Sequence, residues 1–270
     1  MRIGRAARTI AVPALLLVIW QLAGSLQPAT SSVPTPIRVM GAAGTMIASG
    51  DIEVAMTVSL GRVLIGFALG AGFGALLGLV MGYYRPAERN LDPLVQTFRM
   101  VAAIALVPLA IIWFGPHGEA AIFIIAYGAF FPVVVNAVSA VRSVDPSLVR
   151  AARTMGLPSW RIIQQVIMPA GLPTLFVGLR LGMGTAWGAI LAAELTVSAT
   201  SPATVSSGTS SATGAASGGI GFLMFYLYDN RVDLSEIVVA MIAIGVAAYV
   251  IDRLMRLAQY RVIPWTRHVA

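Results

Sequence analysis

The chain has 270 residues, of which 58% are hydrophobic and only 11% are charged, and its net charge is +7. This composition is far more apolar than that of soluble domains and indicates a protein of the lipid bilayer. All 18 basic residues are arginine, so there is no lysine to bind nucleotide phosphates in a P-loop. The absence of cysteine excludes disulfides, thiolate metal ligands and a cysteine nucleophile.

The first predicted element is an N-terminal helix. Three arginines precede an uncharged apolar run over residues 9–26, an arrangement that also occurs in signal peptides. This run is nearly long enough to cross a bilayer, and further apolar segments follow it. We therefore expect the helix to be retained as a membrane span.

Five further apolar runs can reach, with their flanks, the ~20 residues that cross a bilayer. They are residues 63–83, 100–114, 120–141, 169–193 and 237–251. The chain is thus predicted to be an all-α integral membrane protein with about six transmembrane helices. We divide it into an N-terminal helix with an extracytoplasmic segment (1–56), a transmembrane domain (57–256) and a cytoplasmic C-terminal tail (257–270).

The arginines predict the orientation of these spans, because cytoplasmic loops of membrane proteins are enriched in basic residues. With the N-terminus inside, the loops and tails on the inner side receive thirteen arginines, and the outer loops receive only Arg38 and Arg231. Both termini are therefore expected in the cytoplasm. The thirteen are Arg2, Arg5, Arg8, Arg85, Arg89, Arg142, Arg150, Arg153, Arg161, Arg253, Arg256, Arg261 and Arg267.

The second span carries glycine at every fourth position. Such a repeat removes side chains from one stripe of a helix and lets a neighbouring backbone approach. We interpret the stripe as a close helix contact in preference to a ligand groove. Its members are Gly66, Gly70, Gly74, Gly78 and Gly82.

Residues 196–219 consist almost entirely of Ser, Thr, Gly and Ala. Such a segment buries too little apolar surface to offset the entropy of ordering it. We expect a solvated extracytoplasmic loop, with a glycan-bearing stalk or a tether for a partner as the alternatives.

The polar segment at residues 145–169 interrupts the apolar chain with two short predicted helices. Asp145 can cap the first helix with Pro146 at its first position, and Gly156 can end it with a positive φ. Pro158 can then open the second helix. A DNA-binding helix-turn-helix has similar spacing, but spans on both sides would hold this unit at the membrane surface, so no nucleic-acid partner is expected.

The same segment, RAARTMGLPSWRIIQQVIMP, resembles the EAA loop of ABC-importer permeases. In that family the loop is the coupling helix that docks onto a separate ATPase subunit. Arg150 replaces the family's glutamate. The positions at the matching spacing are Ala151, Ala152, Gly156, Val166, Met168 and Pro169, and the resemblance implies an ATPase interface that includes Arg150, Ala151, Ala152, Gly156, Leu157, Pro158, Trp160 and Arg161.

Other stretches, such as SLGRVLIGFALG and ALVPLAIIWFG, resemble the branch of these permeases that imports nitrate, sulfonates and taurine. The resemblance implies the type I ABC importer permease architecture in a bacterial inner membrane. It also implies two ATPase subunits that hold Mg-ATP, a second permease copy in a homodimer, an extracytoplasmic solute-binding protein and contact with membrane lipid, but no cofactor or metal in this chain. Where the branch has paired prolines, this chain reads Met100-Val101-Ala102-Ala103, so the kink that they produce is expected to be missing.

Four charged residues fall in or near the predicted spans, where an unpaired charge is costly. Arg180 and Arg99 are candidates for an anion site on the transport pathway, although we favour structural bonds. Arg62 and Glu194 should lie near the outer boundary, where they can pair with each other, and we favour a structural pair over a gate.

Taken together, the sequence predicts a channel-forming permease subunit that performs no catalysis. A membrane-embedded enzyme would need converging catalytic groups at membrane depth, which the spans lack. A self-contained secondary transporter is the main alternative, but it would usually show two related halves and acidic residues for ion coupling.

Overall fold

The computed structural model describes residues 3–26, 34–116, 118–200, 215–230 and 234–264, and every regular element within them is helical. The order of these elements along the chain is α1 (Ile3–Ser25), α2 (Pro36–Ala48), α3 (Asp51–Tyr83), α4 (Arg85–Phe98), η1 (Ala103–Leu106), α5 (Val107–Phe114), α6 (Gly118–Arg142), α7 (Pro146–Thr154), α8 (Ser159–Ile162), η2 (Ile163–Ile167), α9 (Met168–Thr200), α12 (Ile220–Asn230) and α13 (Ser235–Val262).

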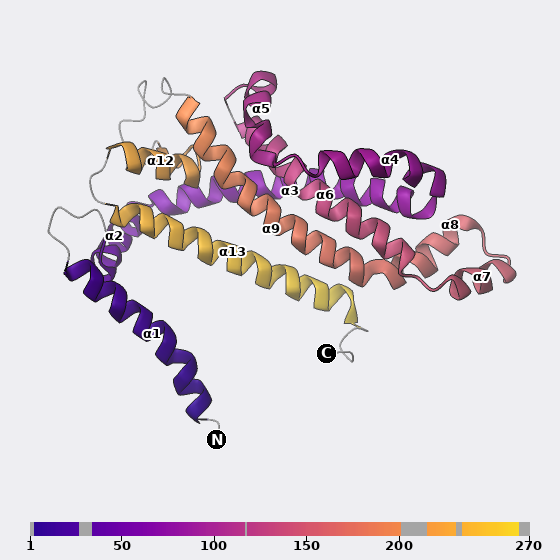
Figure 1. Cartoon of the computed structure of the whole chain (residues 1–270), viewed down its shortest axis with the longest axis horizontal. Coiled ribbons are helices and arrows are strands. Elements are labelled where there is room, and N and C mark those ends of the chain that lie inside the picture. The colour runs from indigo at the N-terminus through magenta and orange to yellow at the C-terminus, as the bar shows by residue number, and fades with distance from the viewer. Residues whose placement is uncertain (1–2, 27–33, 117, 201–214, 231–233, 265–270) are drawn as a thin grey trace. The chain divides into compact units, whose positions relative to one another are not determined.

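The helices form two compact units. Unit 1 comprises residues 1–58 and 202–246 and contains α1, α2 and α12. Unit 2 comprises residues 59–201 and 247–270 and contains the helices from α4 to α9. The long helices α3 and α13 contribute residues to both units. Within unit 2, α6 and α9 lie side by side over most of their length (Figure 1).

Four segments of the described chain are long and apolar enough to cross a membrane, namely α3, α6, α13 and the continuous stretch Ser159–Ser198. A fifth crossing arises if α4 and the η1–α5 segment count as one broken span. The apolar part of α1, Ala14–Ser25, is shorter than these segments. The structure therefore bears out an all-helical membrane protein, with four to five candidate spans where the sequence predicted about six.

The predicted span at residues 100–114 forms, in the structure, the second half of a bent pair of helices. The chain bends by 86° between α4 and the η1–α5 segment, so the kink expected to be missing is present without the paired prolines. The break leaves backbone carbonyls at the end of α4 without helical partners. The Tyr127 hydroxyl of α6 donates to the carbonyl of Phe98 at 2.5 Å, and this bond stabilises the bend.

Helix α6 is the centre of unit 2, and the glycine stripe of α3 packs on it as predicted. A Cβ atom built at Gly78 would lie 2.5 Å from the carbonyl oxygen of Val134, so only glycine allows this approach. On the other side of α6, a Cβ atom built at Gly171 of α9 would lie 2.5 Å from the carbonyl oxygen of Ala140. Glycines on two helices thus enclose α6, and Val133 is fully buried there.

The prediction of a loop over residues 196–219 is wrong at both ends, and its centre, residues 201–214, lies outside the described residues. Helix α9 continues to Thr200, and Ser198 is buried with its hydroxyl bonded to the carbonyl of Glu194 at 2.5 Å. Ala215 and Ala216 are helical and fully buried. A segment rich in small residues can still be helical and buried where neighbouring helices approach it closely. Composition alone therefore does not predict a loop.

Candidate functional site

The segment 145–169 folds as a helix, a tight turn and a second helix, as the sequence predicted. The carboxylate of Asp145 accepts a hydrogen bond from the backbone N–H of Ser147 at 2.8 Å and caps α7. This backbone bond, a side-chain bond from Ser147 and the nearby charge of Arg150 lower the pKa of Asp145 below its ordinary value. The charged carboxylate therefore stabilises the start of α7 at neutral pH.

The turn after α7 depends on Gly156, whose φ is +77°. Two hydrogen bonds close it, from Leu157 N–H to the carbonyl of Ala152 at 3.2 Å and from Gly156 N–H to the carbonyl of Arg153 at 3.0 Å. This pair of bonds defines a Schellman motif, which commonly ends helices at a left-handed glycine. The turn fixes the direction of α8 relative to α7.

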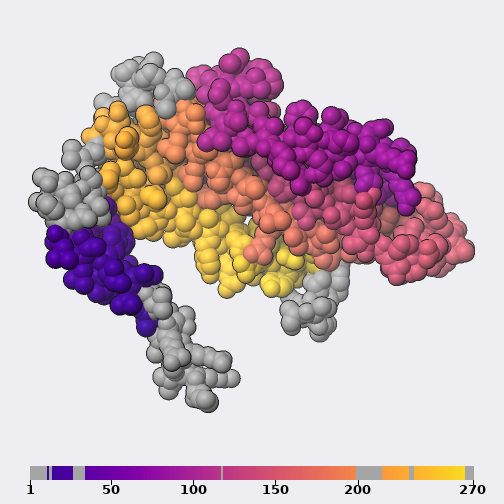
Figure 2. All heavy atoms as spheres, viewed as in Figure 1, coloured from indigo at the N-terminus to yellow at the C-terminus, as the bar shows by residue number. Residues whose placement is uncertain are grey.

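An apolar cluster attaches the segment to the ends of α3 and α6. Val144, Ala152, Ile162 and Ile167 are buried in it, and Tyr83 and Val141 of the long helices pack against them. Figure 2 shows α7 and α8 projecting at one end of unit 2. The segment is thus a fixed projection anchored on two membrane helices.

The predicted interface residues divide between the two sides of this projection. Ala152 is buried and Leu157 is half-buried, so both stabilise the segment itself. Trp160 is 65% exposed and is not packed on its own membrane domain. The remaining predicted residues are also exposed, and they are Arg150, Ala151, Gly156, Pro158 and Arg161.

Sequence reasoning missed two apolar side chains of the projection. Met155 is 73% exposed and Leu148 is 51% exposed. Exposed apolar side chains grouped on a surface are typical of a protein or membrane contact. The signal in the sequence was that both are large apolar residues within the polar segment 145–169.

Arg62 and Glu194 form an ion pair within unit 2, as the sequence suggested. The Nη1 atom of Arg62 lies 2.8 Å from Oε1 of Glu194, and the hydroxyl of Ser59 donates to the same carboxylate at 2.9 Å. Glu194 is only 3% exposed. This buried carboxylate therefore joins α3 to α9.

Arg180 also has a partner, which the sequence did not reveal. Its Nε atom lies 2.5 Å from Oδ1 of Asp252 on α13, and Arg256 binds the other oxygen of the same carboxylate at 2.9 Å. Asp252 was missed because the last apolar run stops at residue 251, whereas α13 continues to Val262. The geometry agrees with a structural bond from Arg180 to a neighbouring helix.

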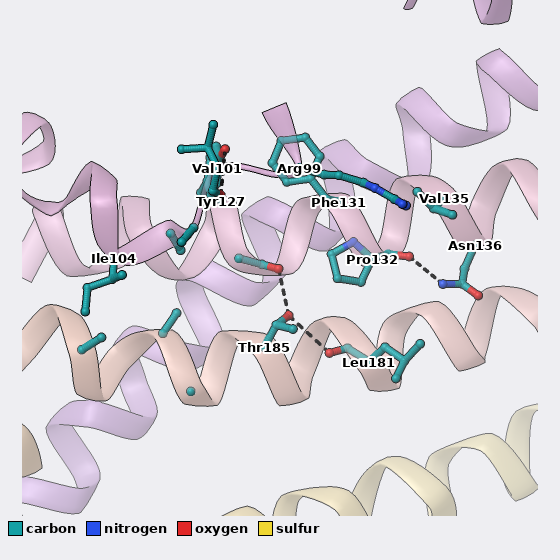
Figure 3. A pocket seen from close by; sticks show the side chains of 16 residues that line it. Arg99, Val101, Ile104, Tyr127, Phe131, Pro132, Val135, Asn136, Leu181 and Thr185 are labelled. Carbon is teal, nitrogen blue, oxygen red and sulfur yellow. Dashed lines mark hydrogen bonds between the residues drawn. The ribbon is translucent and has the colours of Figure 1, made fainter. Parts of the chain in front are cut away.

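A groove of about 630 Å³ runs along α6 and α9 beneath the break after α4. Its walls are mostly apolar, and its polar side chains include Arg99, Asn136 and Thr185 (Figure 3). Thr185 donates to the carbonyl of Gly128 at 2.8 Å, and the Asn136 amide donates to the carbonyl of Pro132 at 2.8 Å. Arg99 is exposed in this groove and makes no ion pair with any described residue.

The groove can therefore hold a small anion by charge but has no group arranged for covalent chemistry. In the ranges that the structure describes, no three His, Asp or Glu side chains gather as a metal site requires. What the arrangement offers is one unneutralised cation above a groove between two long helices.

Comparisons with known proteins agree with these features. The family model described as "Binding-protein-dependent transport system inner membrane component" matches residues 70–268. The chain is 38% identical over 174 residues to the putative aliphatic sulfonates transport permease protein SsuC of Bacillus subtilis, a match over 64% of this chain and 63% of that protein. It is 30% identical over 248 residues to the bicarbonate transport system permease protein CmpB of Synechococcus elongatus, a match over 88% of this chain and 82% of CmpB.

A structural comparison supports the fold. A chain in an inward-facing structure of the MetNI methionine ABC transporter matches with a TM-score of 0.51 at 20% sequence identity. The match covers 79% of this chain and 93% of that one. At this identity it shows the fold alone.

These matches decide between the classes of membrane protein that the sequence left open. The family model covers most of the chain, including the segment 145–169 and the groove. A permease component is not itself catalytic, which excludes the membrane-embedded enzyme, and the family is not that of self-contained secondary transporters. The chain therefore belongs to the binding-protein-dependent inner-membrane permeases of ABC transporters.

Proposed function

We propose that this permease subunit carries a small oxyanion, of the class of sulfonates, nitrate, taurine or bicarbonate, for an ABC importer. SsuC and CmpB are named for sulfonates and bicarbonate, which share a negatively charged oxygen group. The observation that carries the proposal is the unpaired charge of Arg99 in the groove along α6 and α9.

The contrast among the three arginines of the predicted spans is the physical argument. Arg62 is bound by Glu194, and Arg180 is bound by Asp252. Arg99 has no such counter-ion among the described residues, and a cation beside an apolar groove attracts an anion strongly when water is excluded. Its guanidinium offers several donors to one oxyanion.

The segment 145–169 is proposed as the contact with the ATPase. Trp160, Met155 and Leu148 are exposed apolar side chains on a projection that is anchored to α3 and α6. Aromatic side chains and Met are enriched where proteins bind each other. A movement at this projection would therefore reach α6, which lines the groove.

The complete importer then contains two ATPase subunits that bind Mg-ATP, two copies of this permease and an extracytoplasmic solute-binding protein. It would sit in a bacterial inner membrane with both termini of the permease in the cytoplasm. ATP binding by the ATPase pair would alternate the groove between the two sides of the membrane.

The test of the anion site is an Arg99→Gln variant in cells or vesicles that contain the whole importer. Charged hydrogen bonds contribute about 1.5–3 kcal/mol, so we expect the half-saturating concentration for uptake to rise about 10- to 100-fold. Uptake should be measured separately for a sulfonate, nitrate, taurine and bicarbonate.

Arg99→Lys is the matched control, since it keeps the charge but loses the forked geometry. It should retain uptake with a smaller rise in the half-saturating concentration. The amount of ATPase subunit that co-purifies with the permease should be unchanged in both variants. Unaltered half-saturation with Arg99→Gln for every transported anion would show that Arg99 does not contact the solute.

A further inference from the structure

A second cavity, of about 750 Å³, lies where the ends of α3 and α6 meet α4 and α7. We call it the arginine pocket, because five arginines line it against a single glutamate. Arg85 and Arg89 come from α4, and Arg150 and Arg153 come from α7. Arg142, the last residue of α6, completes the set.

The pocket keeps most of its positive charge. Glu88, its only acidic lining residue, is held in an ion pair with Arg142. Asp145 attracts Arg150, but its carboxylate caps α7. Five arginines against these two carboxylates leave a net charge of +3. Arg85, Arg89 and Arg153 have no ion pair among the described residues.

The positions of these arginines make them converge. Arg85 and Arg89 are four residues apart on α4, and Arg150 and Arg153 are three apart on α7, so each pair shares one helix face. Both faces border the same cavity. This concave arrangement differs from the projecting surface of Trp160 and Met155, neither of which lines the pocket.

Apolar side chains form the rest of the wall. They come from the ends of the spans α3 and α6 and from the segment that follows, and they are Tyr83, Val141, Val144, Val149 and Ile167. Cationic and apolar groups thus meet in one cavity at the level where two membrane helices end. An inorganic anion needs only the cationic part, whereas an amphiphile with an anionic headgroup uses both.

We propose that the arginine pocket binds the phosphate headgroup of an anionic phospholipid. Basic pockets between transmembrane helices on the cytoplasmic side suit such headgroups, and arginine binds phosphate through two parallel hydrogen bonds. The bound lipid bridges α4, which leads to Arg99, and α7 of the projection. The pocket is therefore a place where the membrane's lipid composition acts on the permease.

The test is native mass spectrometry of the purified full-length permease, titrated with phosphatidylglycerol and with phosphatidylcholine of the same acyl chains. We expect phosphatidylglycerol to bind at least about tenfold more tightly, given several unpaired arginines. Each arginine near a lipid surface contributes about fivefold in affinity, so Arg85→Gln with Arg89→Gln should weaken phosphatidylglycerol binding about 25-fold.

Two further variants and one competitor make the result decisive. Arg150→Gln with Arg153→Gln removes the opposite wall and should give a similar loss, which covers the case in which the first pair does not fold. Arg253→Gln with Arg261→Gln removes two exposed arginines of α13 outside the pocket and should change binding less than about twofold. Millimolar inorganic phosphate should not displace the lipid.

Equal affinity for the two lipids, or an equal loss in the α13 pair, would overturn the proposal. Complete displacement by inorganic phosphate would show a free-anion site, and complete displacement by the ATPase would show a protein contact, and either would also overturn it. The lipid titration is independent of solute uptake, so its failure is distinguishable from a failure of the Arg99 experiment.

Discussion

Gly156 holds the backbone conformation on which the turn between α7 and α8 depends. Its φ of +77° lies in the left-handed region, which costs most other residues about 1–2 kcal/mol. No other atom lies within 4 Å of the position that a Cβ atom would occupy, so the cost of a side chain is conformational and not steric. Two substitutions at position 156 can therefore be compared that differ mainly in how readily the new residue adopts a positive φ.

We predict that Gly156→Val uncouples the permease from its ATPase without preventing membrane insertion. A β-branched residue disfavours the left-handed conformation, so α8 and Trp160 should change direction relative to α7. Insertion depends on apolar length and should be normal. The measurements are the amount of permease in the membrane, the ATPase recovered on co-purification, and uptake.

Gly156→Asn is the matched control, because asparagine adopts positive φ more readily than other residues with side chains. It should retain most of the coupling. Normal ATPase recovery and normal uptake with Gly156→Val would contradict the assignment of residues 145–169 as the coupling element.

The charged residues show how far single residues can be interpreted from sequence. The pair Arg62 and Glu194 was foreseen because both positions fall at one predicted boundary. The partner of Arg180 was not, since Asp252 lies 72 residues away on a helix that extends beyond its apolar run. Contacts between distant segments depend on helix rotation and helix ends, which hydropathy does not specify.

At the scale of helices, α6 is held by close backbone contacts from both sides. Glycines of α3 and α9 approach its carbonyl oxygens, and a side chain at these positions would collide with backbone that cannot move cheaply. Gly72 of α3 is different, because nothing lies within 4 Å of its Cβ position. One helix thus carries both a packed and an open glycine.

We predict that Gly78→Val destabilises the permease by about 1–3 kcal/mol, as overpacking of a tight contact does. Gly72→Val is the control and introduces the same side chain in the same helix at an open position. Thermal unfolding of the detergent-purified protein should show a lower midpoint for Gly78→Val alone. Equal midpoints for the two variants would show that the α3–α6 contact is looser than the structure indicates.

The glycine stripe of α3 could be predicted from the sequence, whereas the bend after α4 could not. A repeat of four residues matches the turn of a helix, so a close contact along this stripe was predictable from α3 alone, whereas its partner α6 was not. The 86° bend after α4 was not, because its stabilising bond comes from Tyr127 on another helix. Paired prolines would have indicated a kink in the sequence. Here the hydrogen bond from Tyr127 stabilises the bend without them.

At the scale of the whole molecule, the arginine pocket constrains the topology. Arg89 on α4, after the long helix α3, and Arg153 on α7, after α6, line the same cavity and so lie on the same side of the membrane. Because the candidate span α6 lies between them, a crossing by α6 requires the chain to cross once more between Arg89 and the start of α6. The bent pair α4 and η1–α5 is the segment available for that crossing.

The last prediction tests this topology with reporters inserted at three points. Insertions after Arg89 and after Thr154 should be cytoplasmic, and one after Pro116, between α5 and α6, should be extracytoplasmic. The physical reason is the bias of arginine toward cytoplasmic loops, combined with the shared cavity of Arg89 and Arg153. With the bent pair crossing, α3 and the later spans give five crossings, so α1 must cross as a sixth if both termini are cytoplasmic. A reporter fused before Arg2 therefore decides whether α1 spans: it should be cytoplasmic, on the same side as a reporter after Ala270. An extracytoplasmic N-terminus with a cytoplasmic C-terminus would leave α1 outside the count, and a cytoplasmic reporter after Pro116 would show that the bent pair is re-entrant.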